Sequence, residues 1–250
     1  ASRSPTAASN ARKRLSAFYT WALPRLPDGA INPVQGAIAA PAPAARARVL
    51  TSSELSALWA VLEREREPWR TGLRLLILTG QRRGEVFSAD WSEFDLGERI
   101  WTIPAARAKN GKAHLVPLSD EAVEVLRTFA GVEADGEVPR GGPLFPAAGG
   151  RPFSRAARRI RSAVSRVVQS EVEPWTWHDI RRTVATGLQR LGVRLEVTEA
   201  VLNHVSGTRA GIVGVYQRYE WLDEKRAALS AWAAEVVGRE ESDNVIQLRA

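Results

Sequence analysis

The chain has 250 residues, with 35 lysines and arginines against 28 acidic residues, which gives a formal charge of +7 at pH 7. The absence of cysteine excludes a disulfide framework and a thiolate metal site, and three histidines are too few to favour a conventional zinc site. No apolar run is long enough to cross a membrane. Excess positive charge favours polyanionic partners such as nucleic acid, although GC-rich codon usage also produces an arginine bias.

The first helical pattern is amphipathic and ends at about Trp21. Residues 24–48 are rich in proline, alanine and glycine, which is typical of a stiff, extended linker. We therefore expect residues 1–45 to be the end of one helical domain plus its linker, and residues 46–237 to form a second domain. Residues 238–250 have the composition of a polar tail. The complete absence of methionine predicts that the chain is processed at its start or belongs to a longer protein.

The second domain is predicted to be largely helical. Residues 51–54, Thr-Ser-Ser-Glu, have the form of a capping box, and apolar residues follow it at helical spacing. Further helices are predicted over residues 68–79 and over 119–129, where a serine stands at the cap position. After a loop rich in glycine and proline, helical patterns run with breaks over residues 154–237.

Between these helices the hydrophobic period changes from that of a helix to that of a strand. Short strands are predicted at Phe94, at 100–103 and at 114–117, and Asn110-Gly111 is typical of a type I′ hairpin turn. The predicted fold is therefore mainly α with a small antiparallel β-sheet, an α+β class.

Candidate chemistry begins where the second predicted helix of this domain ends. Arg82 lies just after Gly80 and opens a new helix, where free N–H groups and the helix dipole provide a seat for an anion. The alternative is an ordinary helix start with an arginine in solvent.

A second candidate segment lies around His178. His178 and Arg181 are three residues apart, so they share one face of a helix, and Thr176 with Asp179 is a plausible capping box that puts both in the first turn. A guanidinium can fork onto two phosphate oxygens, and an imidazole can relay a proton near neutral pH. A capped amphipathic helix with a chance histidine is the alternative.

The third segment contains a histidine and a tyrosine. His204 follows Asn203, a residue that tolerates the left-handed backbone of a tight turn. Tyr216 is the candidate nucleophile, with Tyr219 as its rival. Phenol has a reference pKa of about 10, and nearby cations favour the phenolate that attacks.

In their order along the chain, these segments resemble the tyrosine recombinases, and most closely the phage- and genomic-island-type integrases. The matching segments are Gly80-x-Arg82-x-x-Glu85, His178-x-x-Arg181, Leu202-Asn203-His204 and Tyr216-Gln217-Arg218. Asn203 stands where the family usually has glycine, and the insertion over residues 206–211 resembles the integrase subgroup with a longer interval before the tyrosine.

The resemblance implies the tyrosine recombinase catalytic-domain fold and a two-step transesterification through a 3′-phosphotyrosine, without metal, ATP or another cofactor. It assigns Tyr216 as nucleophile and Lys109 as the general acid for the departing 5′ oxygen, with Lys112 as the alternative acid. The residues implied to stabilise charge on the phosphate are Arg82, Arg181, His178 and His204.

The implied partners are double-stranded DNA and the other protomers of a tetramer assembled on it, in the bacterial cytoplasm at the nucleoid, with no membrane partner. The expected reaction integrates or excises a phage or genomic island. A DNA-relaxing enzyme of the type IB topoisomerase kind and a non-catalytic DNA-binding module are the alternatives.

The predicted helix from residue 154 carries a basic face that is either exposed to solvent or binds DNA. The DNA-binding residues predicted on and before this helix are Arg151, Arg155, Arg158 and Arg159. The helix after Tyr216 is expected to pack within its own chain, with a swapped dimer as the alternative.

Overall fold

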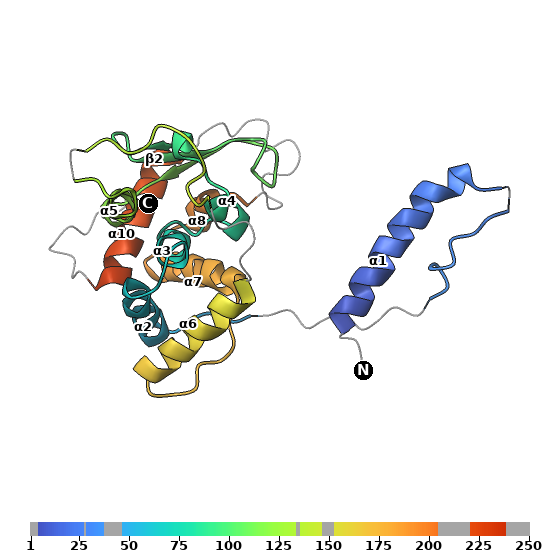
Figure 1. Cartoon of the computed structure of the whole chain (residues 1–250), viewed down its shortest axis with the longest axis horizontal. Helices are drawn as coiled ribbons and strands as arrows, with labels where there is room; N and C mark the ends of the chain where they lie inside the picture. The colour runs from blue at the N-terminus through green and yellow to red at the C-terminus, as the bar shows by residue number, and fades with distance from the viewer. Residues whose placement is uncertain are drawn as a thin grey trace. The chain divides into compact units, whose positions relative to one another are not determined.

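The computed structural model describes residues 5–27, 29–37, 47–133, 136–146, 153–204 and 221–238. The chain divides into two compact units, Ala1–Ala47 and Arg48–Ala250, which are described separately (Figure 1). Within the described ranges, no helix combines the length and the apolar character needed to span a membrane. The predicted polar tail after residue 238 lies outside the described residues.

The first unit is one long helix followed by a short segment of turns that runs back beside it, rather than a helix followed by an extended linker. Helix α1 spans Pro5–Ala22 and runs into the short 3-10 helix η1, Leu23–Arg25. The chain then turns back, because the Asn32 amide contacts the Ser16 carbonyl and hydroxyl, each at 3.4 Å. The extended conformation predicted from residue 24 is therefore wrong as far as residue 37, where the chain forms η1 and turns and buries Asn32 and Val34.

The second unit is mainly helical with one small sheet, which confirms the predicted fold class. Its three strands are antiparallel in the order β1-β2-β3. The described elements are α2 (Ser52–Glu63), α3 (Trp69–Thr79), α4 (Arg83–Phe87), η2 (Trp91–Glu93), β1 (Phe94–Asp95), β2 (Ile100–Ile103), β3 (His114–Pro117), α5 (Asp120–Ala130), α6 (Phe153–Val167), α7 (Trp177–Arg190), α8 (Leu195–Val201) and α10 (Leu222–Val237).

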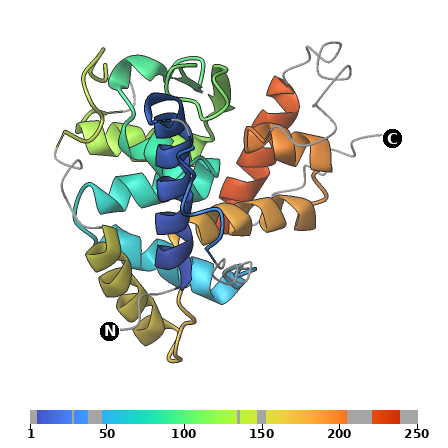
Figure 2. The same ribbon diagram turned by 90° about the vertical axis from the view of Figure 1, so that its right-hand side faces the viewer.

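Helix α3 is the centre of the second unit. Almost every residue along it is buried, and it packs against α2, α4, α5, α7 and α10 (Figure 1). Burial all round is typical of a helix inside a core rather than on a surface. The sheet and α6 lie at opposite ends of this unit in both views (Figure 1 and Figure 2).

Helices α2 and α5 begin at the capping residues that the sequence predicts. Thr51 and Glu54 form a reciprocal capping box at α2, and the Ser119 hydroxyl accepts from the Ala122 N–H at the start of α5. Such caps satisfy N–H groups that have no partner inside the helix. Both predicted caps are confirmed.

The predicted turn at Asn110-Gly111 is wrong. The pairing of Ile103 with His114 leaves residues 104–113 as a long loop between β2 and β3. Within it the Gly111 N–H donates to the Ala108 carbonyl at 2.9 Å, so the central turn residues are Lys109 and Asn110. Among the described residues of this loop only Gly111 has a positive φ, whereas a type I′ turn needs two. The turn is therefore displaced by one residue, and it belongs to the loop rather than closing the strands.

Helix α10 packs inside its own chain. The Trp232 ring is buried and its Nε1–H donates to the Ile77 carbonyl of α3 at 2.7 Å. The ring lies directly over Gly187 of α7, where a Cβ would come within 2.1 Å of it. The preferred prediction, packing within the chain, is confirmed for this helix.

We expect Gly187→Ala to destabilise the second unit by about 2 kcal/mol, because inserting a methyl group into a packed core forces neighbouring side chains out of place. Urea unfolding followed by tryptophan fluorescence measures this. Gly84→Ala is the control, since a Cβ there meets nothing within 4 Å. Equal unfolding free energies for the two variants would contradict the packing described.

Candidate active site

The candidate site is built around the C-terminal end of α8. The last carbonyls of a helix have no partner within it and carry partial negative charge. Here the Val201 carbonyl accepts from Gln81 Nε2 at 2.9 Å and contacts His114 Nε2 at 3.2 Å. The next two carbonyls, of Leu202 and Asn203, accept from arginines. The helix end thus draws donors from several distant segments to one place.

Arg181 joins the ends of two helices from its place on α7. Its guanidinium donates to the Gly80 carbonyl at 2.6 Å and to the Leu202 carbonyl. Gly80 is the left-handed C-cap of α3, so the same side chain closes α3 and α8. Burial, followed by the charge of Arg82, lowers the pKa of Arg181 to about 10. The guanidinium is therefore still charged at neutral pH.

Arg82 approaches the same turn from the start of α4. Its side chain pairs with the buried Glu85 carboxylate at 2.9 Å and donates to the Asn203 carbonyl at 3.3 Å. The other Glu85 oxygen accepts the Arg82 backbone N–H, also at 2.9 Å. Glu85 therefore holds both the backbone and the side chain of Arg82. A quarter of the Arg82 side chain remains exposed to solvent.

His204 completes this turn. Its backbone N–H donates to the Glu199 carbonyl at 3.0 Å, and Asn203 before it adopts φ +49°. Its Nδ1 lies 3.2 Å from the Glu199 carboxylate, which as an acceptor places the ring proton on Nδ1. Burial and then the charge of Arg181 lower the pKa of His204, against a smaller raising effect of Glu199.

His178 is exposed in the first turn of α7, one turn before Arg181. The Asp179 carboxylate accepts from the Thr176 N–H at 2.7 Å and from its hydroxyl at 2.8 Å, so it caps this helix start. Partial burial lowers the pKa of His178, and the charges of Arg182, Arg181 and His204 lower it further. Positive charge on the same face thus favours the neutral imidazole.

Lys109 and Lys112 are both exposed on the loop between β2 and β3. Arg107 ties the loop on one side by pairing with Glu93 and by donating to the Glu85 carbonyl at 3.1 Å. On the other side, Asn110 Nδ2 donates to the Asn203 side-chain oxygen at 2.6 Å. The lysine-bearing loop is therefore attached to the turn that carries His204.

The structure brings five of the predicted residues, or the backbone that carries them, into one region; these are Arg82, Lys109, His178, Arg181 and His204. Tyr216 and its rival Tyr219 lie outside the described residues, as does Arg151. Their predicted roles stay predictions.

Two buried residues of this region were not anticipated from the sequence. Gln81 supports the α8 carboxyl end from the segment between Gly80 and Arg82, and His114 does so from β3. Burial, with Lys225 as the next cause, lowers the pKa of His114 to about 3. The only sequence signal was a polar residue in an apolar strand, because the partner is a backbone carbonyl 87 residues away.

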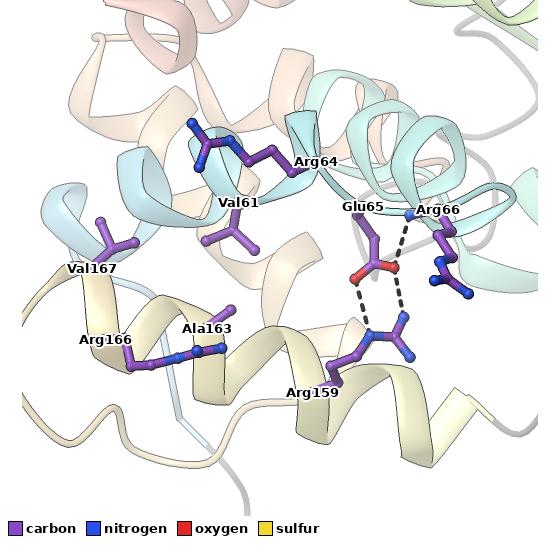
Figure 3. Close-up of a pocket in the computed structure, with 8 residues that line it drawn as sticks. All are labelled: Val61, Arg64, Glu65, Arg66, Arg159, Ala163, Arg166 and Val167. Atoms are coloured by element: carbon purple, nitrogen blue, oxygen red, sulfur yellow. Dashed lines mark hydrogen bonds and ion pairs between the residues drawn. The ribbon is translucent and has the colours of Figure 1, made fainter.

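The basic helix α6 shows two kinds of arginine. Arg155, Arg158 and Arg159 are all exposed, but Arg159 also makes a two-bond ion pair with Glu65 at 2.6 and 3.2 Å. Figure 3 shows this pair across a groove of about 710 Å³ between α6 and the end of α2. The groove is lined by Val61, Arg64, Glu65, Arg66, Arg159, Ala163, Arg166 and Val167. Four guanidiniums against one carboxylate leave it positively charged.

The model of the phage integrase family matches residues 48–218. The chain belongs to this family. The match confirms the resemblance to the tyrosine recombinases. Within curated proteins, the chain is 32% identical over 188 residues to the prophage integrase IntZ of Escherichia coli K12, covering 72% of this chain and 43% of that protein. It is 29% identical over 157 residues to the prophage integrase IntA of the same strain, covering 63% of this chain and 36% of IntA.

Solved structures of integrases share the fold. An integrase of mycobacterium phage Brujita has a TM-score of 0.55 at 19% identity and covers 94% of this chain and 79% of its own. A lambda integrase dimer, residues 75–356, bound to a COC′ core site, has a TM-score of 0.57 at 23% identity and covers 81% of this chain and 73% of its own. At this identity the likeness establishes the fold of this family member.

We expect the stability of the protein to fall as pH falls below 6.5, in part because of His114. The folded chain keeps this ring neutral down to a pKa of about 3, whereas the unfolded chain protonates it near 6.5. Protons therefore bind preferentially to the unfolded state, and this one group should cost about 2 kcal/mol between pH 7.5 and pH 5.

His114→Gln keeps an N–H donor for the Val201 carbonyl but does not titrate, so its unfolding free energy should depend less on pH by that amount. Denaturant unfolding of both proteins at the two pH values is the measurement. Parallel pH profiles would show that His114 is not held neutral.

Proposed function

We propose that the second unit is the catalytic domain of a site-specific DNA recombinase that cuts and rejoins DNA through a 3′-phosphotyrosine. The observation that carries this is the convergence of two guanidiniums on one turn, where Arg82 and Arg181 bind consecutive carbonyls next to His204. A charged pair of this kind, fixed by the fold before substrate binds, is suited to a pentavalent phosphate. The family match supports the same chemistry.

Both arginines keep donors for a phosphate. A guanidinium has five N–H donors, and each of these side chains uses two in the contacts given above. The Arg181 Nε is buried and has no hydrogen-bond partner among the described residues. Two side chains already fixed by the fold therefore lose little further freedom when the phosphate arrives.

The proposed first step joins the Tyr216 phenolate oxygen to phosphorus and breaks the bond to the 5′ oxygen. Lys109 gives a proton to that leaving oxygen, and Arg82, Arg181 and His178 stabilise the charge on the other oxygens. His204 joins them as an imidazolium, because its neutral ring carries its proton on Nδ1 toward Glu199. A 5′ hydroxyl of a partner strand then attacks the phosphotyrosine in the reverse sense. The phosphodiester energy is kept in the linkage, so the exchange needs no ATP and the proposal includes no metal or cofactor.

The proposed partners are double-stranded DNA and further copies of the recombinase. The chain covers 36% and 43% of the lengths of IntA and IntZ. Lambda integrase has been solved as a dimer on a core site and as a tetramer on a Holliday junction. We extend these partners to this chain, with phage or genomic-island DNA as substrate in the bacterial cytoplasm at the nucleoid. Strand exchange is favoured over DNA relaxation or passive binding because the relatives are integrases.

The first unit fits the end of a smaller helical domain with its linker. Leu15, Phe18 and Trp21 lie at helical spacing on α1 and are about half exposed or more. Such an apolar stripe is typical of a helix that packs against others of its own domain. The exposed arginines Arg155 and Arg158, with Arg151 and Arg159, are proposed to contact the DNA backbone.

Tyr216→Phe removes one oxygen and little volume, so it should abolish covalent attachment to a nicked suicide duplex while duplex binding stays nearly unchanged. Denaturing gel electrophoresis of labelled DNA detects the attachment. Tyr219→Phe is the matched control and should still attach. Loss of attachment in Tyr219→Phe alone would move the nucleophile to that residue.

Arg82→Lys and Arg181→Lys keep the positive charge but lose the planar guanidinium that can bind two phosphate oxygens at once. Each should slow cleavage by about 10²-fold or more, which is the typical effect of removing one preorganised hydrogen-bond donor from an active site. Arg181→Lys should also lower the melting temperature more than Arg82→Lys does, because the Arg181 guanidinium is buried and closes two helix ends. Single-turnover cleavage and thermal unfolding separate the two effects. Normal cleavage by Arg181→Lys would make that arginine purely structural.

A further inference from the structure

Asn203 makes a side-chain contact that a glycine at its position would lack. Its backbone is left-handed, at φ +49°, which glycine adopts without strain and asparagine tolerates. Its side-chain oxygen accepts the Asn110 amide at 2.6 Å, across 93 residues of sequence. The asparagine thus keeps the turn that glycine allows and adds a link to the loop between β2 and β3.

The orientation of this link is determined by a second hydrogen bond. The Lys112 N–H donates to Asn110 Oδ1 at 3.1 Å, so the Asn110 oxygen is occupied and its NH₂ group faces Asn203. Lys109 lies between this contact and the Arg107 anchor on Glu93. Both sides of the lysine-bearing turn are therefore held, while the lysine side chain itself is exposed.

The same residue also contacts the arginine side of the site. The Asn203 carbonyl accepts from Arg82 at 3.3 Å, while its side chain holds the loop of Lys109. One residue therefore links a phosphate-binding group to the loop that carries the general acid.

Fold stability alone does not account for this asparagine. Its Nδ2 is buried and has no hydrogen-bond partner among the described residues. A buried donor without a partner lowers the stability of the fold, and a left-handed non-glycine residue adds strain. A residue that costs stability in two ways and joins two parts of a site is better explained by positioning.

We infer that Asn203 and Asn110 form a clasp that positions Lys109 for proton transfer to the leaving 5′ oxygen. The inference rests on the proposed function. In the step that it serves, the Tyr216 oxygen bonds to phosphorus, the bond from phosphorus to the 5′ oxygen breaks, and the Lys109 Nζ proton goes to that oxygen. Asn203 and Asn110 are positioning residues, because they act through Lys109.

Two variants open the clasp from opposite sides. Asn203→Gly keeps a backbone that favours the left-handed turn and removes the acceptor. Asn110→Ala removes the donor toward Asn203 together with the oxygen that accepts from the Lys112 N–H. Hydrogen exchange of the whole chain without DNA should show faster exchange in residues 104–113 for both variants, at nearly unchanged melting temperature. Unchanged exchange in that loop would overturn the clasp.

The catalytic test uses two nicked duplexes that carry the attachment sequence and differ only at the scissile bond, with a bridging 5′ oxygen or a bridging 5′ sulfur. Sulfur leaves without a proton, so only defects in acid catalysis are rescued. Lys109→Ala should lose about 10²-fold or more with oxygen and recover with sulfur. Asn203→Gly and Asn110→Ala should each lose about 10- to 100-fold with oxygen and also recover, and the double variant should be no slower than either single variant.

The outcomes separate the inference from the function on which it rests. If Lys109→Ala recovers with sulfur but the asparagine variants are equally slow on both duplexes, the clasp does not act through Lys109 and the inference fails alone. Wild-type rates for the asparagine variants on the oxygen duplex overturn it as well. If Lys109→Ala does not recover, Lys109 is not the general acid and both assignments fall. If the unaltered chain never attaches to either duplex, the proposed function itself fails.

Discussion

The candidate site depends on the need to satisfy the carbonyl groups at the end of α8. A buried carbonyl without a donor costs about 1–3 kcal/mol. The carbonyls of buried Val201 and Leu202 and of half-buried Asn203 follow one another here. Arg181, Arg82 and Gln81 each supply a donor from another segment. The requirement that completes the helix therefore also brings two guanidiniums side by side, which mutual repulsion would otherwise oppose.

This arrangement also sets the protonation of the histidines. Arg181 is buried and remains charged, and its field adds to burial in lowering the pKa of His204 and His178. Neutral imidazoles beside fixed cations leave the site with positive charge that does not change near neutral pH. In the proposed reaction, an incoming phosphate diester would partly cancel that charge and favour protonation of the rings.

Helix α10 has a related effect at longer range. Trp232 bonds to the α3 carbonyl of Ile77 and covers Gly187 of α7, while Lys225 donates to the Leu115 carbonyl of β3 at 2.6 Å. The segment that follows the candidate nucleophile is thus attached to the helices that carry Gly80 and Arg181 and to the strand beside the lysine loop. Its packing within the chain fixes the position of the α10 N-terminus at Leu222.

Sequence alone predicted the caps at Thr51 and Ser119, the helix face shared by His178 and Arg181, and the family motifs, because these depend on residues three or four apart or on short spacings. It misplaced the turn at Asn110-Gly111, which is centred on Lys109 and Asn110 in the structure, and it did not mark the bond from the Asn110 side chain to Asn203. The anchoring of Arg181 to Gly80 and Leu202, and the burial of His114, were decided only by the tertiary structure. In those contacts a side chain meets a backbone carbonyl from a distant segment, and because every residue has such a carbonyl, no residue type in the sequence marks the partner.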